Sequence, residues 1–213
     1  MTPALTPEIV LQAYMRGIFP MADHRDAADV FWVEPRMRGI LPLDGLHVSR
    51  SLARRIRARP FAVSYDRDFA GVVAGCADRA ETWINAPLVE IYSALHAGGF
   101  AHSIELWEGD ALVGGVFGIA IGGAFFGESM FSRRTDASKI ALVYLVDRLR
   151  EGGFRLFDTQ FITPHLATLG AVEIPREDYR AQLAEAIARR ARFDPAPPEA
   201  LPAQVMQRRT QTS

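Results

Sequence analysis

The sequence contains a single cysteine, Cys76, among its 213 residues. One cysteine cannot form an internal disulfide, which excludes the cross-linked framework of small secreted domains. No apolar stretch reaches the length that spans a bilayer, and the first residues lack the basic and apolar regions of a signal peptide. We therefore expect a cytoplasmic protein with no membrane partner.

The sequence lacks the residue patterns that several classes of enzyme need. The five histidines have no metal-ligand spacing, and the chain has no phosphate-binding loop. The segment 127–131 lacks the second glycine of a hydrolase elbow, so Ser129 is a poor candidate for a nucleophile. The formal net charge is -1, so any contact with nucleic acid must come from a local basic patch.

Apolar periodicity predicts a succession of helices and strands. The first helix is expected from the Thr6 cap to Gly17, and the second from a cap at Ser49 or Ser51 to Pro60. Further helices are expected at 69–77 and 87–98, then through Leu142 and Leu149 as far as Gly152, and finally through Tyr179 and Ile187. Alternation predicts strands at 61–65 and 103–107. The runs 111–119 and 124–131 are apolar on both faces, as in central strands, and 154–157 is predicted to be a short buried strand. This order resembles an α+β, acetyltransferase-like (GNAT) fold, in which a mixed sheet is flanked by helices.

The first 45 residues are expected to form a small N-terminal lobe. The stretch from Ile18 to Leu43 carries prolines at 20, 35 and 42 and is too long for a plain connection. Residues 46–193 would form the catalytic domain. The proline-rich, polar segment 194–213 is predicted to be a disordered tail.

Glu128 is the first residue to suspect of chemistry. It lies in the apolar run 124–131, where an unpartnered carboxylate is costly to bury. One interpretation is a structural ion pair with Arg133, Arg134 or Lys139. The other is that Glu128 holds a cationic amine in a cleft.

Asp158 and Gln160 end the last predicted strand and share one of its faces. A carboxylate beside an amide can orient a nucleophile. An amide is a poor base, so Gln160 would position a group while Asp158 polarises it. The alternative is a turn in which Asp158 caps the following segment.

One basic cluster stands out in the helix predicted before Pro60. No acidic residue lies within it, so its charges lack local partners. A solvated helix face is the ordinary interpretation, and contact with a phosphate backbone is the functional one. The cluster consists of Arg50, Arg54, Arg55, Arg57 and Arg59.

The segment that precedes the longest helix argues against coenzyme A as the acyl donor. Acetyltransferases of this fold hold a pyrophosphate on a glycine-rich turn at this helix N-terminus. Residues 132–139 contain no glycine, and Asp136 stands where the phosphate would sit.

Nine short motifs occur in one order along the chain. They are Tyr14-x-x-Gly-Ile-Phe-Pro20, His47-Val-Ser-Arg-Ser51, Thr82-Trp-Ile84, Ala101-His-Ser-Ile-Glu-x-Trp107, Leu112-Val-Gly-Gly115, Gly127-Glu-Ser-Met-Phe131, Ala137-Ser-Lys139, Asp158-x-Gln160 and His165-Leu-x-x-Leu-Gly-Ala171. As an ordered set, from about residue 7 to about residue 183, they resemble the leucyl/phenylalanyl-tRNA–protein transferases.

The resemblance implies an aminoacyltransferase with no metal and no organic cofactor. Its substrates would be aminoacyl-tRNA carrying Leu, Phe or, less well, Met, and acceptor proteins with N-terminal Arg or Lys. The transfer would mark the acceptor for degradation through the N-degron pathway.

The resemblance also implies roles for individual residues. Glu128 and Gln160 would contact the α-amino group of the donor or the attacking amine, and either Gln160 or the tRNA ribose would relay the proton. The arginine helix would grip the acceptor stem. Trp83 and Tyr92 would lie near the terminal adenosine or the pocket mouth, with core packing as the alternative. The other substrate-binding positions would be Tyr14, Val116, Phe125, Met130, Leu142, Leu145, Leu149 and Phe157.

Two other hypotheses remain at this point. A coenzyme A-dependent acyltransferase of the same fold is disfavoured by the missing pyrophosphate turn. A non-catalytic tRNA-binding module would explain the arginine helix, but it leaves Glu128, Asp158 and Gln160 without a purpose.

Overall fold

The computed structural model describes residues 5–193. Its helices are α1 (Pro7–Tyr14), α2 (Arg50–Arg57), α3 (Phe69–Ala77), α4 (Ala86–Ala97), α5 (Ala137–Glu151), α6 (Pro164–Thr168) and α7 (Arg176–Ile187). Its strands are β1 (Phe19–Met21), β2 (Phe31–Val33), β3 (Met37–Ile40), β4 (Ala62–Tyr65), β5 (Ala101–Glu108), β6 (Ala111–Ile121), β7 (Ala124–Ser132), β8 (Leu156–Gln160) and β9 (Val172–Pro175).

Short polar side chains set the starts of several helices. The Thr6 hydroxyl accepts a hydrogen bond from the N–H of Ile9, and Ser49 does the same for Leu52. Each cap satisfies an N–H group that has no partner within its own helix. The predicted starts of α1 and α2 are therefore confirmed, with Ser49 as the cap of α2.

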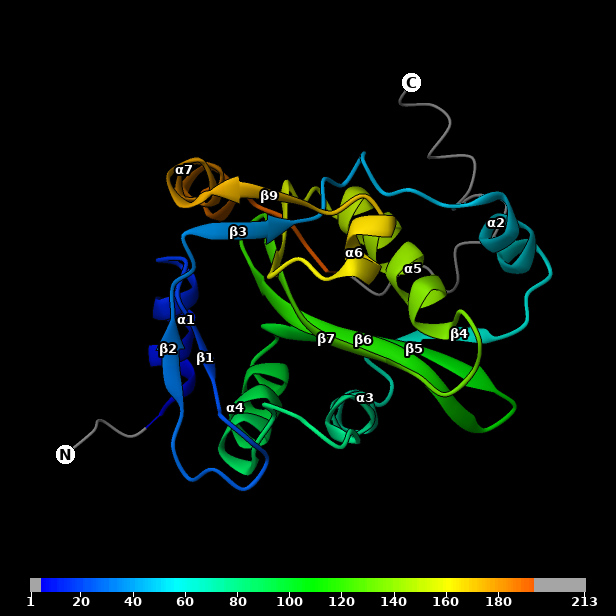
Figure 1. Ribbon diagram of the computed structural model, residues 1–213, viewed down its shortest axis with the longest axis horizontal. Helices are drawn as coiled ribbons and strands as arrows, with labels where there is room; N and C mark the ends of the chain where they lie inside the picture. Colours follow the sequence, from blue (N-terminus) through cyan, green and yellow to red (C-terminus); the bar gives the residue numbers. More distant parts are fainter. Residues whose placement is uncertain (1–4, 194–213) are drawn as a thin grey trace.

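A seven-stranded sheet in the order β4-β5-β6-β7-β8-β3-β9 forms the centre of the molecule. β7 and β8 are parallel, and the other neighbours are antiparallel. Helices α3 and α4 cover one face and α5 covers the other (Figure 1). Two apolar clusters fill the spaces between these layers. This arrangement confirms the predicted α+β class, with a mixed sheet flanked by helices.

The stretch 18–43 is more regular than predicted. β1 and β2 form a separate two-stranded sheet, whereas β3 pairs with both β8 and β9. The last part of the predicted 1–45 lobe thus belongs to the large sheet. β3 has only four residues and pairs with strands far along the chain, so local periodicity carries no signal for it. The predicted tail, 194–213, lies outside the described residues.

Candidate active site

A β-bulge in β7 aims Glu128. Phe117 of β6 is paired with Ser129 and Gly118 with Gly127, which leaves Glu128 without a partner across the ladder. A bulge of this kind redirects a side chain and reverses the alternation beyond it. Phe126 and Phe131 accordingly pack into the same cluster, although five positions separate them.

A cleft of about 610 Å³ opens beside this bulge. The parallel pairing of β7 with β8 ends at Phe126 and Asp158, and the cleft lies beyond that point. The sequence-predicted site residues that line it are Trp83, Val116, Glu128, Met130, Leu142, Phe157 and Gln160. The cleft therefore sets the Glu128 carboxylate and the Gln160 amide beside an apolar floor, and Asp78, Arg79 and Arg133 also line it.

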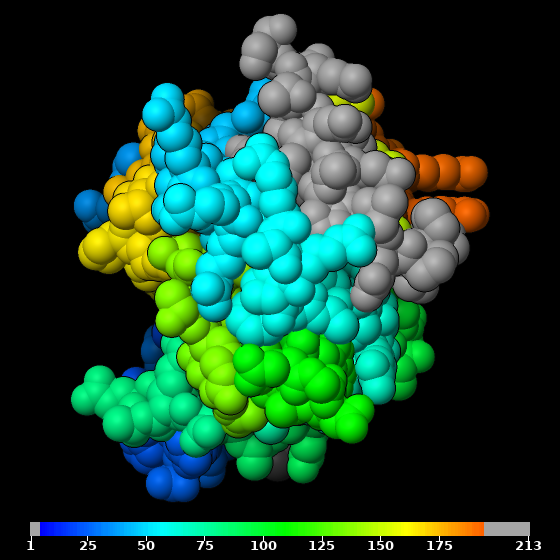
Figure 2. Space-filling view, turned by 90° about the vertical axis from the view of Figure 1, so that its right-hand side faces the viewer, coloured from blue at the N-terminus to red at the C-terminus, as the bar shows by residue number. Residues whose placement is uncertain are grey.

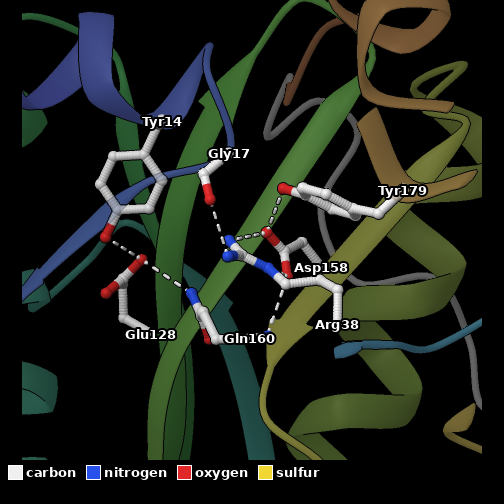
Figure 3. Close-up of polar contacts among 7 residues, drawn as sticks. All are labelled: Tyr14, Gly17, Arg38, Glu128, Asp158, Gln160 and Tyr179. Atoms are coloured by element: carbon white, nitrogen blue, oxygen red, sulfur yellow. Dashed lines mark hydrogen bonds and ion pairs between the residues drawn. The ribbon is translucent and has the colours of Figure 1, made fainter. Parts of the chain in front are cut away.

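Three side chains hold the Glu128 carboxylate. The Tyr14 hydroxyl donates to Oε1 at 2.7 Å (Figure 3). The Tyr92 hydroxyl donates to Oε2 at 2.9 Å. The Gln160 amide nitrogen donates to Oε1 at 3.3 Å. The predicted structural ion pair is wrong, because the three candidate cations have other partners. Arg133 pairs with Asp78, Arg134 with Glu108 and Lys139 with Asp136.

The electrostatics of Glu128 suit proton or amine binding near neutral pH. Burial raises its pKa from 4.5 to about 7, although the hydrogen bonds from the two tyrosines oppose that rise. Burial and the Glu128 charge raise the pKa of Tyr14 and of Tyr92 well above the ordinary value, so both remain donors. Perturbed carboxylates in clefts are frequent at functional sites.

Asp158 lies behind the cleft rather than in its wall. It is fully buried and forms an ion pair with Arg38 of β3 at 2.6 Å. Its Oδ1 accepts from the backbone N–H of Gln160 at 2.8 Å, as in an Asx-turn. The next helix, α6, is capped by Thr163 instead. No hydrogen bond between Asp158 and the Gln160 side-chain amide occurs within residues 5–193.

The sequence matches one family of known proteins along most of its length. A family model described as leucyl/phenylalanyl-tRNA protein transferase matches residues 40–184, and that of its N-terminal domain matches residues 4–36. The chain belongs to this family. A relative named leucyl/phenylalanyl-tRNA–protein transferase from Cereibacter sphaeroides is 63% identical over 211 residues, which is 99% of both chains. One of the same name from Ruegeria pomeroyi is 63% identical over 210 residues, 99% of this chain and 100% of the relative.

A solved structure titled as FemX shares the fold. Its TM-score is 0.52 at 13% identity, and the match covers 79% of this chain and 66% of that one. At this identity the likeness concerns the fold alone.

Six of the residues predicted to be catalytic or to bind the substrate lie outside the cleft wall of this transferase. Tyr14 and Tyr92 are fully buried and reach the site only through Glu128. Leu145 and Leu149, on α5, are core residues, as their periodicity indicates. Phe125 lies in the same core and packs edge-on to Phe157, with 5.7 Å between ring centroids. Asp158, described above, is the sixth.

Several residues around the cleft of this family member had no role in the sequence predictions. Among them, Phe19, Met21 and Phe161 line the cleft, and the Phe19 and Phe161 rings meet edge-on at 5.7 Å between centroids. Arg38 lies behind the cleft, paired with Asp158. For Phe19 and Met21 the available signal was the apolar character of the stretch 18–43, since a solvated loop has little use for apolar residues.

The five predicted tRNA-binding arginines lie on α2 and just after it, at the opposite end of the molecule from α1 (Figure 1). All five are exposed, while Leu52 and Ile56 face the core. Figure 2 shows this end of the molecule facing the viewer, with these residues in cyan. Arg55 is 4.0 Å from Asp136, and no other ion pair involves these arginines within residues 5–193.

Two classes of feature are absent from the part of the chain that the structure describes. Across residues 5–193, no three His, Cys, Asp or Glu side chains gather where they could bind a metal ion. In the same range, no helix has both the length and the apolar character needed to span a bilayer.

Proposed function

We propose that this transferase moves Leu or Phe from aminoacyl-tRNA to the N-terminal Arg or Lys of an acceptor protein, with Met as a weaker donor. It acts in the cytoplasm and marks the acceptor for degradation through the N-degron pathway. Family membership supports aminoacyl transfer. The observation that carries the proposal is the bulge-aimed Glu128, set beside Gln160 in an apolar cleft.

The floor of the cleft suits an apolar donor side chain that is not branched at Cβ, such as Leu or Phe. Val116, Leu142 and Phe157 contribute apolar surface, and Met130 adds a flexible one. Such a floor rejects β-branched Ile and Val by shape, at typically about 1–3 kcal/mol per methylene. The partly buried Trp83 at the same cleft supports a stacking contact with the terminal adenine.

Glu128 and Gln160 would bind the α-amine of the donor or the attacking amine of the acceptor. Because the Gln160 nitrogen donates to Glu128, its oxygen is the atom that can accept from an incoming amine. Near neutral pH the Glu128 carboxylate can hold the ammonium form of an amine. Transfer of a donor whose α-amine is acetylated distinguishes the two amines: it is lost if Glu128 binds the donor amine and persists if Glu128 binds the acceptor amine.

The step itself needs little more than orientation, since the ester is already activated. The acceptor nitrogen attacks the ester carbonyl carbon, a C–N bond forms, and the C–O bond to the ribose breaks. One proton passes from the amine to the departing ribose oxygen. Either Gln160 or a ribose hydroxyl can carry that proton.

The N-terminus of α5 supports tRNA rather than coenzyme A as the carrier. Asp136 occupies the N-cap position in a left-handed conformation, with a φ of 66°, and its carboxylate pairs with Lys139 at 3.3 Å instead of capping the helix. A diphosphate placed there would meet a carboxylate in place of a ring of amide N–H groups.

The exposed arginines of α2 would contact phosphates of the tRNA. Replacing Arg54 and Arg57 together by alanine is expected to weaken tRNA binding and to reduce the slope of log K against log salt by roughly 1–2, since each lost contact removes nearly one released counterion. A filter-binding titration from 50 to 300 mM salt measures it. The matched control replaces the exposed Arg189 and Arg190 of the α7 end, and an unchanged slope in the α2 variant contradicts phosphate contact.

Purified protein, leucyl-tRNA and a peptide with N-terminal Arg provide the direct test of the function. We expect a conjugate with leucyl- and phenylalanyl-tRNA, and much less with isoleucyl-tRNA. A peptide that differs only in an N-terminal alanine is the control acceptor. Absence of conjugate at every concentration would reject the proposed function, and tight calorimetric binding of acetyl-coenzyme A would favour the acyltransferase alternative.

A further inference from the structure

Arg38 is an arginine inside the protein, with 1% of its surface exposed. Its Nε donates to Asp158 Oδ1 at 2.9 Å, and its Nη2 donates to Oδ2 at 2.6 Å. This is the two-pronged geometry in which guanidinium and carboxylate groups bind most strongly. The third prong, Nη1, donates to the carbonyl oxygen of Gly17 at 2.9 Å. One side chain of β3 thus ties together β8 and the segment that follows α1.

Two aromatic rings enclose this guanidinium. Its carbon lies 4.6 Å from the ring centroid of Phe19 and 4.6 Å from that of Tyr179. The Tyr179 hydroxyl, on α7, also donates to Asp158 Oδ2 at 2.6 Å. Each Asp158 oxygen therefore accepts two hydrogen bonds: Oδ1 from Arg38 and the Gln160 backbone, and Oδ2 from Arg38 and Tyr179 (Figure 3).

The only bond from Asp158 toward Gln160 reaches the backbone N–H of that residue. Gln160 has a φ of 57°, a left-handed conformation that residues with a side chain seldom adopt. Such a conformation persists only where the surroundings hold it. The Asp158 bond holds it here, and the resulting backbone points the Gln160 amide at Glu128.

The Gly17 bond acts on the other hydrogen-bond partner of Glu128 Oε1, Tyr14. Gly17 follows α1, and α1 carries the tyrosine whose hydroxyl donates to Glu128. The Arg38 side chain therefore supports both partners of the Glu128 Oε1 atom, Gln160 through Asp158 and Tyr14 through Gly17.

We propose that Arg38 and Tyr179 are positioning residues of this transferase, and that Asp158 serves as their anionic partner rather than as the group that polarises the Gln160 amide. This inference rests on the proposed function, because its rate measurements follow the proposed transfer reaction. Asp158 holds the Gln160 backbone and takes up no proton during transfer.

A double-mutant cycle tests this assignment. We expect Arg38→Met and Asp158→Asn each to lower the single-turnover transfer rate by about 10- to 100-fold, the range expected when a bond to a buried charge is lost. The variant with both changes should lose no more than the worse single variant, because the two residues act as one unit. Losses that multiply would overturn the proposal, since Asp158 would then contribute independently of Arg38.

Tyr179→Phe keeps the assignment testable if the Arg38 variants fold poorly. This change removes one hydrogen bond to Asp158 and leaves the ring over Arg38. We expect the rate to fall roughly 10-fold, while the affinity for tRNA carrying phenylalanine through a stable amide bond stays unchanged. A wild-type rate, or an equal loss of affinity, would count against positioning. Arg36→Met, an exposed arginine two residues from Arg38, is the matched control and should match the wild type.

Two further readouts separate this inference from the proposed function. Arg38→Lys keeps a cation but cannot bond both Asp158 oxygens and the Gly17 carbonyl in one plane. Compared with Arg38→Met, it should therefore restore more of the lost stability than of the lost transfer rate. The free energies of unfolding of the four cycle proteins show the same coupling without any reaction. Coupled stabilities with an inactive wild type would reject the proposed function alone, whereas additive stabilities would reject the Arg38–Asp158 unit itself.

Discussion

Replacing Glu128 by glutamine is expected to slow peptide transfer at pH 8 by about 10- to 100-fold, the loss expected for one hydrogen-bonded charge. Glutamine keeps the size of the side chain and can still bond to Tyr14 and Tyr92. It cannot hold an ammonium group by charge. Single-turnover transfer to a peptide with N-terminal Arg measures the change, and affinity for the loaded tRNA should remain within a few-fold of the wild type.

The same substitution is expected to stabilise the fold at high pH. The pKa of Glu128 rises from 4.5 to about 7 on folding, so between these values the folded state holds the proton more tightly than the unfolded state. Wild-type stability therefore falls as pH rises from about 5 to about 8. Glu128→Gln should remove this fall and add on the order of 2 kcal/mol at pH 8, because one pKa unit corresponds to about 1.4 kcal/mol and the partly open cleft reduces the full effect.

Urea unfolding at pH 5 and at pH 8 measures this gain. The two proteins should differ little at pH 5 and clearly at pH 8. Glu90→Gln, an exposed carboxylate on α4, is the control and should change neither stability nor rate. A Glu128→Gln protein that transfers at the wild-type rate would remove Glu128 from the reaction.

Alanine substitutions at Asp158 and Gln160 are expected to separate two residues that the sequence places together. Asp158→Ala should destabilise the fold by about 3–5 kcal/mol, because it leaves the Arg38 charge buried and without its carboxylate. Gln160→Ala should lower the rate by about 10- to 100-fold with a much smaller loss of stability, since its amide lines the cleft and bonds to an ionisable partner.

Chemical denaturation and single-turnover transfer, carried out on both variants, distinguish these outcomes. Gln160→Asn is the matched variant, because asparagine tolerates the left-handed backbone but has a shorter reach. We expect it to keep the stability and lose the rate. Equal destabilisation by both alanine substitutions would contradict the division of labour between Asp158 and Gln160.

Sequence patterns predicted the helices and strands whose formation depends mainly on neighbouring residues. Helical spacing and a serine or threonine cap located α1 and α2, alternation located β5, and apolar runs between turns located β6 and β7. The isolated carboxylate at 128 marked the site, because a charge within an apolar run is costly to bury unless it has a partner or a task.

Other features depended on contacts between distant parts of the chain. Whether Glu128 pairs with an arginine or with two tyrosines depends on a bulge, and a bulge depends on the register between two strands. Periodicity likewise could not tell that Leu142 would line the cleft and Leu149 would not, because both lie on the buried side of α5.

The sequence by itself determined the order of the main helices and strands, the family and the identity of the carboxylate and amide at the site. Only the tertiary structure decided the partners of these groups. Arg38 and Asp158 are 120 positions apart, and Tyr14 and Glu128 are 114 apart. A hydrogen bond forms within about 3 Å, whereas sequence patterns report on turns and strands of a few residues, so the fold alone brings these groups into reach.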